Sequence, residues 1–373
     1  MISNFWELGR RCVEADFAGR SSSIKSCCSR AVSAVSIGTL IALALLAMPS
    51  CGFPDRSREA AKISTEIRGL PGVHEAESHY DTSFDGGAHF NLDVVVTKDI
   101  PADQAARIGE VFVERVAAAK FNRFDVKLNV EYGPPGRASD YGYQTSATFS
   151  FSFNELARQA ITPSAAEVSD SLRTLTRIAQ NPAVGAVALT QPNAAPQSSS
   201  SDSPRARGLL VVLADQVTQS QISALTDVFP ELDKAQWVIL GGSEPSYRPN
   251  TYQIVGRAPT LEIRDLWNRI DKQALSVRGR ISANTEGTPS DLNPAATIVD
   301  FSLGGGPDAD ERLDEATRTV IPSLVQLPGP TLLRFTWANE TASVMIGGCQ
   351  PPGKTARPPT PTEKNLRSLY ERC

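Results

Sequence analysis

Residues 124–132 read FDVKLNVEY, and this stretch indicates the fold class more clearly than any other part of the 373-residue chain. Its apolar and polar residues alternate strictly, with Phe, Val, Leu, Val and Tyr against Asp, Lys, Asn and Glu. Alternation with a period of two places the two sets of side chains on opposite faces of an extended strand. We therefore predict a β-strand with one buried face and one solvated face.

The residues on either side of this strand predict a helix before it and hairpins around it. Pro101 suits the first turn of a helix, and a turn at residues 85–87 separates the apolar runs 73–80 and 90–97. Residues 149–153 predict the strand that follows. The apolar stripe of the helix is formed by Ala105, Ile108, Phe112, Val116 and Ala119.

The order helix, strand, strand recurs along the chain, which predicts internal repetition. We assign three αββαββ units, at residues 57–160, 161–257 and 258–348. Hairpins joined by helices then predict an α+β fold, in which each unit has an antiparallel four-stranded sheet with helices on one face, in the style of ferredoxin-like sandwiches. The predicted helices are 57–69, 101–119, 164–179, 219–228, 260–272 and 310–324, and the later strands are 184–190, 208–213, 236–240, 252–255, 276–283, 297–303, 332–337 and 342–346.

A charge-free run at residues 31–50, AVSAVSIGTLIALALLAMPS, predicts export from the cytosol. A basic segment followed by an apolar run and small residues is typical of a secretory signal peptide. We therefore predict a signal peptide at residues 1–50, with an uncleaved helical anchor or a buried core helix as the alternatives. The basic residues before the run are Arg10, Arg11, Arg20, Lys25 and Arg30.

The end of that run, Met48-Pro49-Ser50-Cys51, resembles the lipobox of bacterial lipoproteins. With its Ala-rich and Arg-rich composition, the chain resembles the exported lipoproteins of actinobacterial envelopes. The resemblance implies that Cys51 carries the lipid and that residues 51–56 form a tether. It also implies a location on the outer leaflet of the cell membrane, facing the extracytoplasmic side, and it implies no activity.

The cysteines agree with export. Three of the six lie in the predicted leader, Cys51 takes the lipid, and Cys349 and Cys373 remain. Two thiols outside the cytosol predict one disulfide, with unpaired or intermolecular thiols as the alternative. This bond would close a tail, residues 349–373, whose first half is Pro-rich and whose last residues, 362–373, can be helical.

The charge of the chain argues against nucleic acid as a partner. The formal net charge is −4, and removing a leader of net charge +2 leaves about −6 on the exported part. No Gly-rich fingerprint of a nucleotide or dinucleotide site is complete, so no cofactor is expected.

All three histidines, His74, His79 and His89, fall on the first predicted hairpin among carboxylates. Alternation puts His79 on one strand face with Glu75 and Glu77. A solvated polar face is the favoured interpretation, because no H-x-x-x-H or C-x-x-C spacing is present. A metal site that uses His79, His89 and a carboxylate is the alternative.

The tryptophans outside the leader are Trp237, Trp267 and Trp337. Trp267 shares a helical stripe with Leu261, Arg264 and Ile270, and the charged member predicts partial exposure of that stripe. Packing in the core nevertheless explains these tryptophans more simply than a recognition surface does.

No nucleophile elbow or S-x-x-K motif lies in the exported part, so no catalytic residue is assigned and an enzyme is not favoured. The sequence predicts a membrane-anchored, non-enzymatic binding or scaffold protein of the cell envelope, whose partner is a protein complex, a lipid or a glycan. One alternative is an envelope metal-binding protein or enzyme that uses the histidine hairpin. The other is a carrier of an apolar ligand, which needs a deep cavity between sheet and helices.

Overall fold

The computed structural model describes residues 54–83, 87–133, 143–154, 160–191, 208–241, 249–285, 295–337, 340–349 and 358–373. The described residues all belong to one compact unit, residues 53–373. The predicted signal peptide and Cys51 therefore lie outside the described residues. Within the described ranges, no helix is both long enough and apolar enough to cross a membrane.

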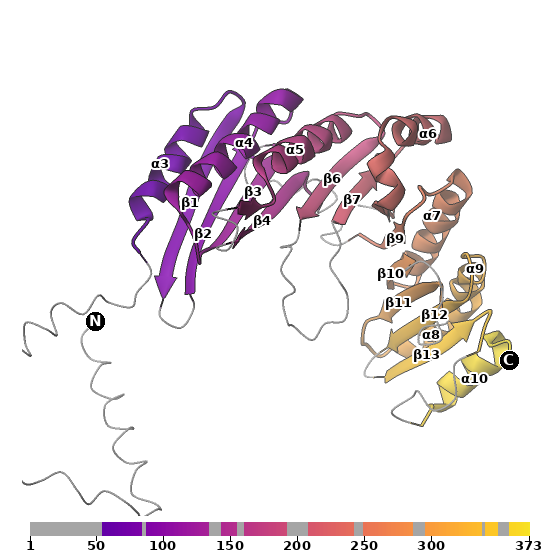
Figure 1. Ribbon diagram of the computed structural model, residues 1–373. Helices are drawn as coiled ribbons and strands as arrows, with labels where there is room; N and C mark the ends of the chain where they lie inside the picture. The colour runs from indigo at the N-terminus through magenta and orange to yellow at the C-terminus, as the bar shows by residue number, and fades with distance from the viewer. Residues whose placement is uncertain are drawn as a thin grey trace, which may run out of the picture. The chain divides into compact units, whose positions relative to one another are not determined.

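Within the described residues a helix followed by two strands occurs six times (Figure 1). A short strand, β5 (Ala160–Thr162), and a final helix, α10 (Pro361–Tyr370), stand outside this order. The elements in order are α3 (Ser57–Arg68), β1 (Val73–Ser83), β2 (Gly87–Val96); α4 (Ala102–Ala119), β3 (Asp125–Tyr132), β4 (Ser146–Asn154); α5 (Ala165–Ala179), β6 (Val184–Gln191), β7 (Gly208–Leu213); α6 (Gln219–Val228) with the 3-10 turn η1 (Pro230–Lys234), β8 (Gln236–Leu240), β9 (Thr251–Val255); α7 (Leu261–Ser276), β10 (Arg280–Thr285), β11 (Thr297–Leu303); and α8 (Ala309–Thr319), α9 (Ile321–Leu324), β12 (Thr331–Trp337), β13 (Glu340–Ile346).

The local sequence explains where the helices begin and end. Ser164 and Glu167 form a capping box at the start of α5, and Thr218 with Gln221 repeats it at α6. The helix predicted over residues 310–324 is divided into α8 and α9, and Pro322 stands in the first turn of α9. A proline inside a continuous helix would remove one backbone hydrogen bond and clash with the preceding turn.

The strands form one mixed sheet of 13 strands within the described residues, and here the prediction of separate antiparallel four-stranded sheets is wrong. Strands of one hairpin are antiparallel, as in β1 with β2, whereas strands on either side of a helix are parallel, as in β2 with β3. A helical crossover returns the chain to the same end of the sheet, which makes the flanking strands parallel. The parallel pairs β4–β6 and β9–β10 also cross the predicted unit boundaries.

The helices from α3 to α9 cover one face of this sheet (Figure 1). Strand side chains on that face join the helices in two main clusters, which meet between Trp237 and Ile239 of β8. The three tryptophans among the described residues are buried, so core packing is confirmed and the partial exposure expected for Trp267 is wrong. The other face of the sheet bears no described helix and carries most of the polar strand residues.

Candidate functional site

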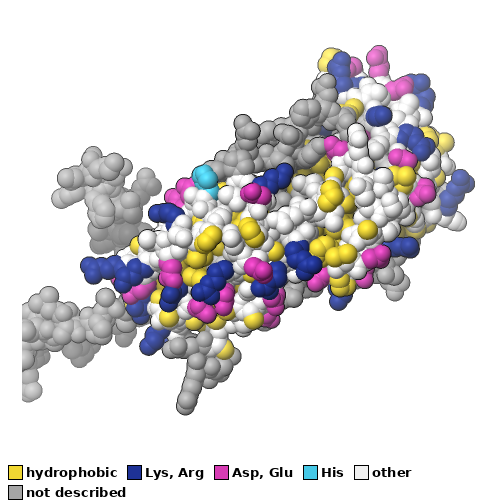
Figure 2. All heavy atoms as spheres, turned by 90° about the horizontal axis from the view of Figure 1, so that it is seen from above, with side chains coloured by type: hydrophobic (Ala, Val, Ile, Leu, Met, Phe, Trp, Pro, Cys, Tyr) yellow, Lys and Arg dark blue, Asp and Glu magenta, His cyan; other side chains and the backbone are white. Residues whose placement is uncertain are grey.

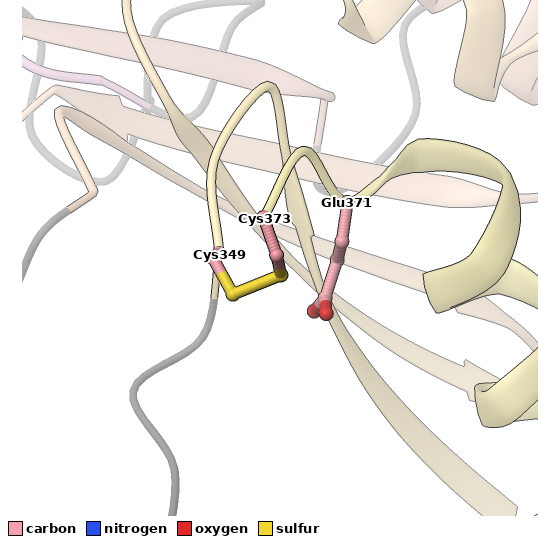
Figure 3. Close-up of side chains that lie close together, drawn as sticks. All are labelled: Cys349, Glu371 and Cys373. Atoms are coloured by element: carbon pink, nitrogen blue, oxygen red, sulfur yellow. A yellow bond between two sulfur atoms is a disulfide. The ribbon is translucent and has the colours of Figure 1, made fainter.

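The predicted disulfide between Cys349 and Cys373 is present, and it joins the end of β13 to the residues after α10 (Figure 3). The carboxylate of Glu371 lies beside it and accepts a hydrogen bond from the backbone N–H of Met345 at 3.2 Å. Cys349, Glu371 and Cys373 form the one close group of three potential metal ligands among the described residues. Because both sulfurs are in the disulfide, they are not thiolate ligands for a metal.

Replacing both cysteines, as Cys349→Ser with Cys373→Ser, is expected to lower the free energy of unfolding by roughly 3 kcal/mol, because the disulfide closes a loop over a sequence separation of 24. Urea denaturation followed by circular dichroism measures this difference. The unmodified protein under a reducing agent is the control and should match the variant. Equal unfolding midpoints with and without the disulfide would contradict the expectation.

His79 and His89 lie on the helix-free face of the sheet, and each pairs with a different aspartate. His79 Nε2 lies 3.2 Å from Asp93 Oδ2, and His89 Nδ1 lies 3.3 Å from Asp125 Oδ2. Asp93 also accepts a hydrogen bond from Asn129, at 2.7 Å. Among the described residues, neither histidine joins two further ligands at the spacing that a metal site needs. These contacts form a partly solvated polar ladder across β1, β2 and β3.

A groove on the helix-covered face exposes apolar side chains of β6 and β7. One row of residues crosses the sheet through registered pairs, and its first members, Val94, Val130 and Ala147, are at most 1% exposed. The row continues into Leu189 and Leu209, which face each other across β6 and β7 and are only half-buried. The helices that cover the row over β2–β4 therefore leave it uncovered at β6 and β7.

The lengths of the helices explain this opening. α5 packs tightly on α4 because Gly109 has no side chain; a Cβ there would lie 2.6 Å from Val168. On the other side of α5, α6 spans 10 residues against 15 in α5, and the 3-10 turn η1 begins at Pro230. Arg177 over the ring of Phe229, 5.6 Å from its centroid, closes the space between α5 and the end of α6.

The groove has a volume of about 720 Å³, which is in the range of small-molecule sites. Its apolar lining comes from Leu175, Ile178, Leu189, Leu209 and Pro230. Seen from above the view of Figure 1, hydrophobic side chains gather at the surface near the middle of this unit (Figure 2).

Charged side chains surround the apolar lining, and carboxylates outnumber cations. Among the residues that line the groove, the carboxylates belong to Glu167 and Asp170 of α5 and to Glu231 of η1, and the one cation belongs to Lys234. The Glu167 carboxylate accepts a hydrogen bond from the backbone N–H of Ser164 at 2.8 Å, and Asp170 pairs with Arg173. Carboxylates at the rim of an apolar floor suit a ligand with an apolar body and a cationic group.

None of the groove residues is among the site residues predicted from sequence. Leu189 and Leu209 have the residue type and alternation of ordinary core positions, and their exposure depends on how far α5 and η1 lie apart. The one feature of the local sequence that indicates the groove is the short helix α6, which ends before Pro230.

A small apolar cluster occupies the helix-free face of the sheet. Ala186, Val212 and Val238 are buried there, beside Tyr143. The pKa of Tyr143 is raised above its usual value, because the effect of burial is larger than the opposite effect of its hydrogen bonds with Gln253 and Thr251. This cluster interrupts a face that is otherwise polar on β1–β4.

Comparison with protein-family models, with curated proteins and with solved structures gave no match to this chain. Its function is therefore inferred from its own geometry and chemistry.

Proposed function

We propose that this protein is a non-enzymatic binding protein of the cell envelope, held at the outer leaflet by a lipid on Cys51. Its groove between α5 and η1 binds an amphiphile with an apolar body and a cationic group. The half-buried pair Leu189 and Leu209, in a row that is otherwise at most 1% exposed over β2–β4, is the observation that carries the proposal. Apolar side chains left at the surface of a groove are stabilised when a ligand removes them from water.

The architecture supports a role as a scaffold as well. The order helix, strand, strand recurs six times in the described chain, and each hairpin adds two strands to the same sheet. We propose that these are internal repeats, which extend one binding platform. The basic and apolar leader before Cys51 supports export and anchoring. In the sequence Cys51 stands shortly before Ser57, so a lipid there tethers the chain just ahead of α3.

Native mass spectrometry of the protein extracted from its own membranes tests both parts of the proposal. We expect a mass that corresponds to a chain beginning at a lipidated Cys51, together with a bound amphiphile in stoichiometric amount. The variant Cys51→Ser should lose the lipid and keep the amphiphile. An unmodified full-length chain would contradict the anchor, and a lipidated chain without any small molecule would contradict the groove.

Substitution in the groove tests the site directly. With N-phenyl-1-naphthylamine as a fluorescent apolar probe, Leu209→Gln is expected to weaken binding about tenfold, because it replaces an apolar contact in the floor by an amide. The matched control is Leu369→Gln on α10, where the leucine is 54% exposed and outside the groove. Equal effects of the two variants on binding would mean that the probe binds outside the groove.

The acidic rim is tested with two competitors that share one alkyl chain. A quaternary ammonium amphiphile should displace the probe at lower concentration than the alkyl sulfate of equal length, with both kept below their micelle concentrations. The reverse order would contradict the cationic group in the proposed ligand.

A further inference from the structure

The two edge strands of the sheet, β1 and β13, differ in how far other parts of the chain cover them. The outer edge of β13 is covered by the C-terminal segment: Arg367 Nε donates to Ser343 O at 3.3 Å, and Gly347 N donates to Tyr370 O at 3.3 Å. The disulfide holds this cover in place. An edge with paired backbone groups does not accept a further strand.

The outer edge of β1 is covered only at one end. Ala76 O faces outward, because it accepts hydrogen bonds from Ser64 Oγ at 2.9 Å and from Arg68, both on α3. Backbone groups of alternate residues in a strand point to the same side, so those of Ser78, Tyr80 and Thr82 face outward as well. In the described part of the chain these three residues have no backbone partner on that side. About half of an 11-residue edge strand is therefore open.

Carboxylates follow this open edge on the helix-free face. Glu75, Glu77 and Asp81 are exposed, and none of them forms an ion pair with another described residue. His79, between them, already contacts Asp93. Two copies of this strand would bring like charges together, so the charges discourage self-association of the edge. The same charges attract a strand of opposite sign.

We propose that the outer edge of β1 accepts an extended segment of a partner protein as an additional strand. The segment carries Lys or Arg at alternate positions, which fall on the face of Glu75, Glu77 and Asp81, and small or polar residues between them. Main-chain hydrogen bonds to Ser78, Tyr80 and Thr82 provide the affinity, and the alternating charges provide the selectivity. This interaction is independent of the groove between α5 and η1.

The probe is a fluorescein-labelled peptide in which Lys alternates with Thr, added to the purified full chain and followed by fluorescence anisotropy. Thr82→Pro removes an outward N–H and leaves the ladder to β2 intact, since proline is tolerated on an edge. We expect it to weaken binding about tenfold, whereas Thr82→Val, which keeps the N–H, leaves binding unchanged.

The charges are tested with the triple variant Glu75→Gln/Glu77→Gln/Asp81→Asn, which should weaken binding about tenfold as well. The matched control removes the same charge from α8, as Asp310→Asn/Glu311→Gln/Asp314→Asn, and should bind like the unmodified protein. Hydrogen exchange should slow at residues 77–83 when the peptide is bound.

Four results would overturn the proposal. The first is that the peptide does not bind even at millimolar concentration, and the second is that it binds Thr82→Pro as tightly as the unmodified protein. The third is that a peptide of the same composition with methylated amides, which cannot pair with a strand, binds as tightly as the original peptide. A dimer of the chain through β1 in sedimentation experiments would also overturn it, because the edge would then be occupied by a second copy.

Discussion

Trp267→Ala is expected to lower the free energy of unfolding by about 3–5 kcal/mol, the range seen when a large aromatic side chain is removed from a core. Trp267 is fully buried on α7, and its ring lies 5.3 Å from that of Tyr252 on β9. The side chain fills the space between helix and sheet in the C-terminal core cluster. A cavity of that size is only partly filled by relaxation of the neighbours.

Trp267→Phe distinguishes the contribution of ring packing to stability from the contribution of the indole N–H. The indole Nε1 is buried and has no hydrogen-bond partner among the described residues. Replacement by phenylalanine therefore breaks no hydrogen bond, and the expected loss is about 1–2 kcal/mol, from volume alone. Guanidinium denaturation followed by circular dichroism measures all variants without relying on tryptophan emission.

Val255→Ala is the control for Trp267, since Val255 is 48% exposed on β9. This variant should stay within about 0.5 kcal/mol of the unmodified protein. A loss below about 1 kcal/mol for Trp267→Ala would mean that the position is not buried.

The second large effect is expected for Gly241→Ala and Asp271→Ala. Each should lower the free energy of unfolding, and the two losses should be strongly non-additive. Asp271 is 1% exposed and accepts a hydrogen bond from Asn250 Nδ2 at 2.7 Å. Asn250 in turn accepts a hydrogen bond at Oδ1 from the N–H of Ile281 at 2.9 Å. Asp271→Ala leaves a buried amide donor without this acceptor and should cost about 3 kcal/mol.

Gly241 lies against the same carboxylate. A Cβ at this position would fall 2.3 Å from Asp271 Oδ1 and 2.4 Å from its Cγ. Gly241→Ala alone should therefore cost about 2 kcal/mol through overpacking. When Asp271→Ala is already present, the new methyl group enters the space that the carboxylate has left. The loss in free energy of unfolding caused by Gly241→Ala should then nearly vanish.

A double-mutant cycle by chemical denaturation measures the coupling, which we expect to be about 2 kcal/mol. Gly304→Ala is the matched control, because a Cβ there meets nothing within 4 Å. Simple additivity of Gly241→Ala and Asp271→Ala would show that the two residues are not in contact.

The error about Trp267 has a definite physical cause. The sequence places Arg264 on the same helical stripe, and a charged residue there predicts exposure. In the structure Arg264 is 8% exposed, and its guanidinium donates to the carbonyl oxygens of Asp215 and Val217 in the loop before α6. Burial lowers the pKa of Arg264. No local pattern reveals that a loop some 47 residues earlier provides these acceptors.

Elements with a strong local cause were predicted well. Strict alternation at residues 124–132 gives β3 (Asp125–Tyr132), and Pro101 immediately precedes α4. The tail predicted to be helical contains α10, and Cys349 and Cys373 form the predicted disulfide. Each of these features depends on side-chain periodicity, on proline geometry or on a small number of possible partners.

The sheet and the groove depend on contacts between distant residues. Nothing in β4 or β6 alone states that the two strands pair, and their pairing merges the predicted separate sheets into one. The exposure of Leu189 and Leu209 likewise follows from the short α6 and from the side of α5 on which α4 packs. Periodicity records which face of an element is apolar, whereas strand order, edges and grooves are set by which elements meet, because backbone pairing and close packing act across the whole chain.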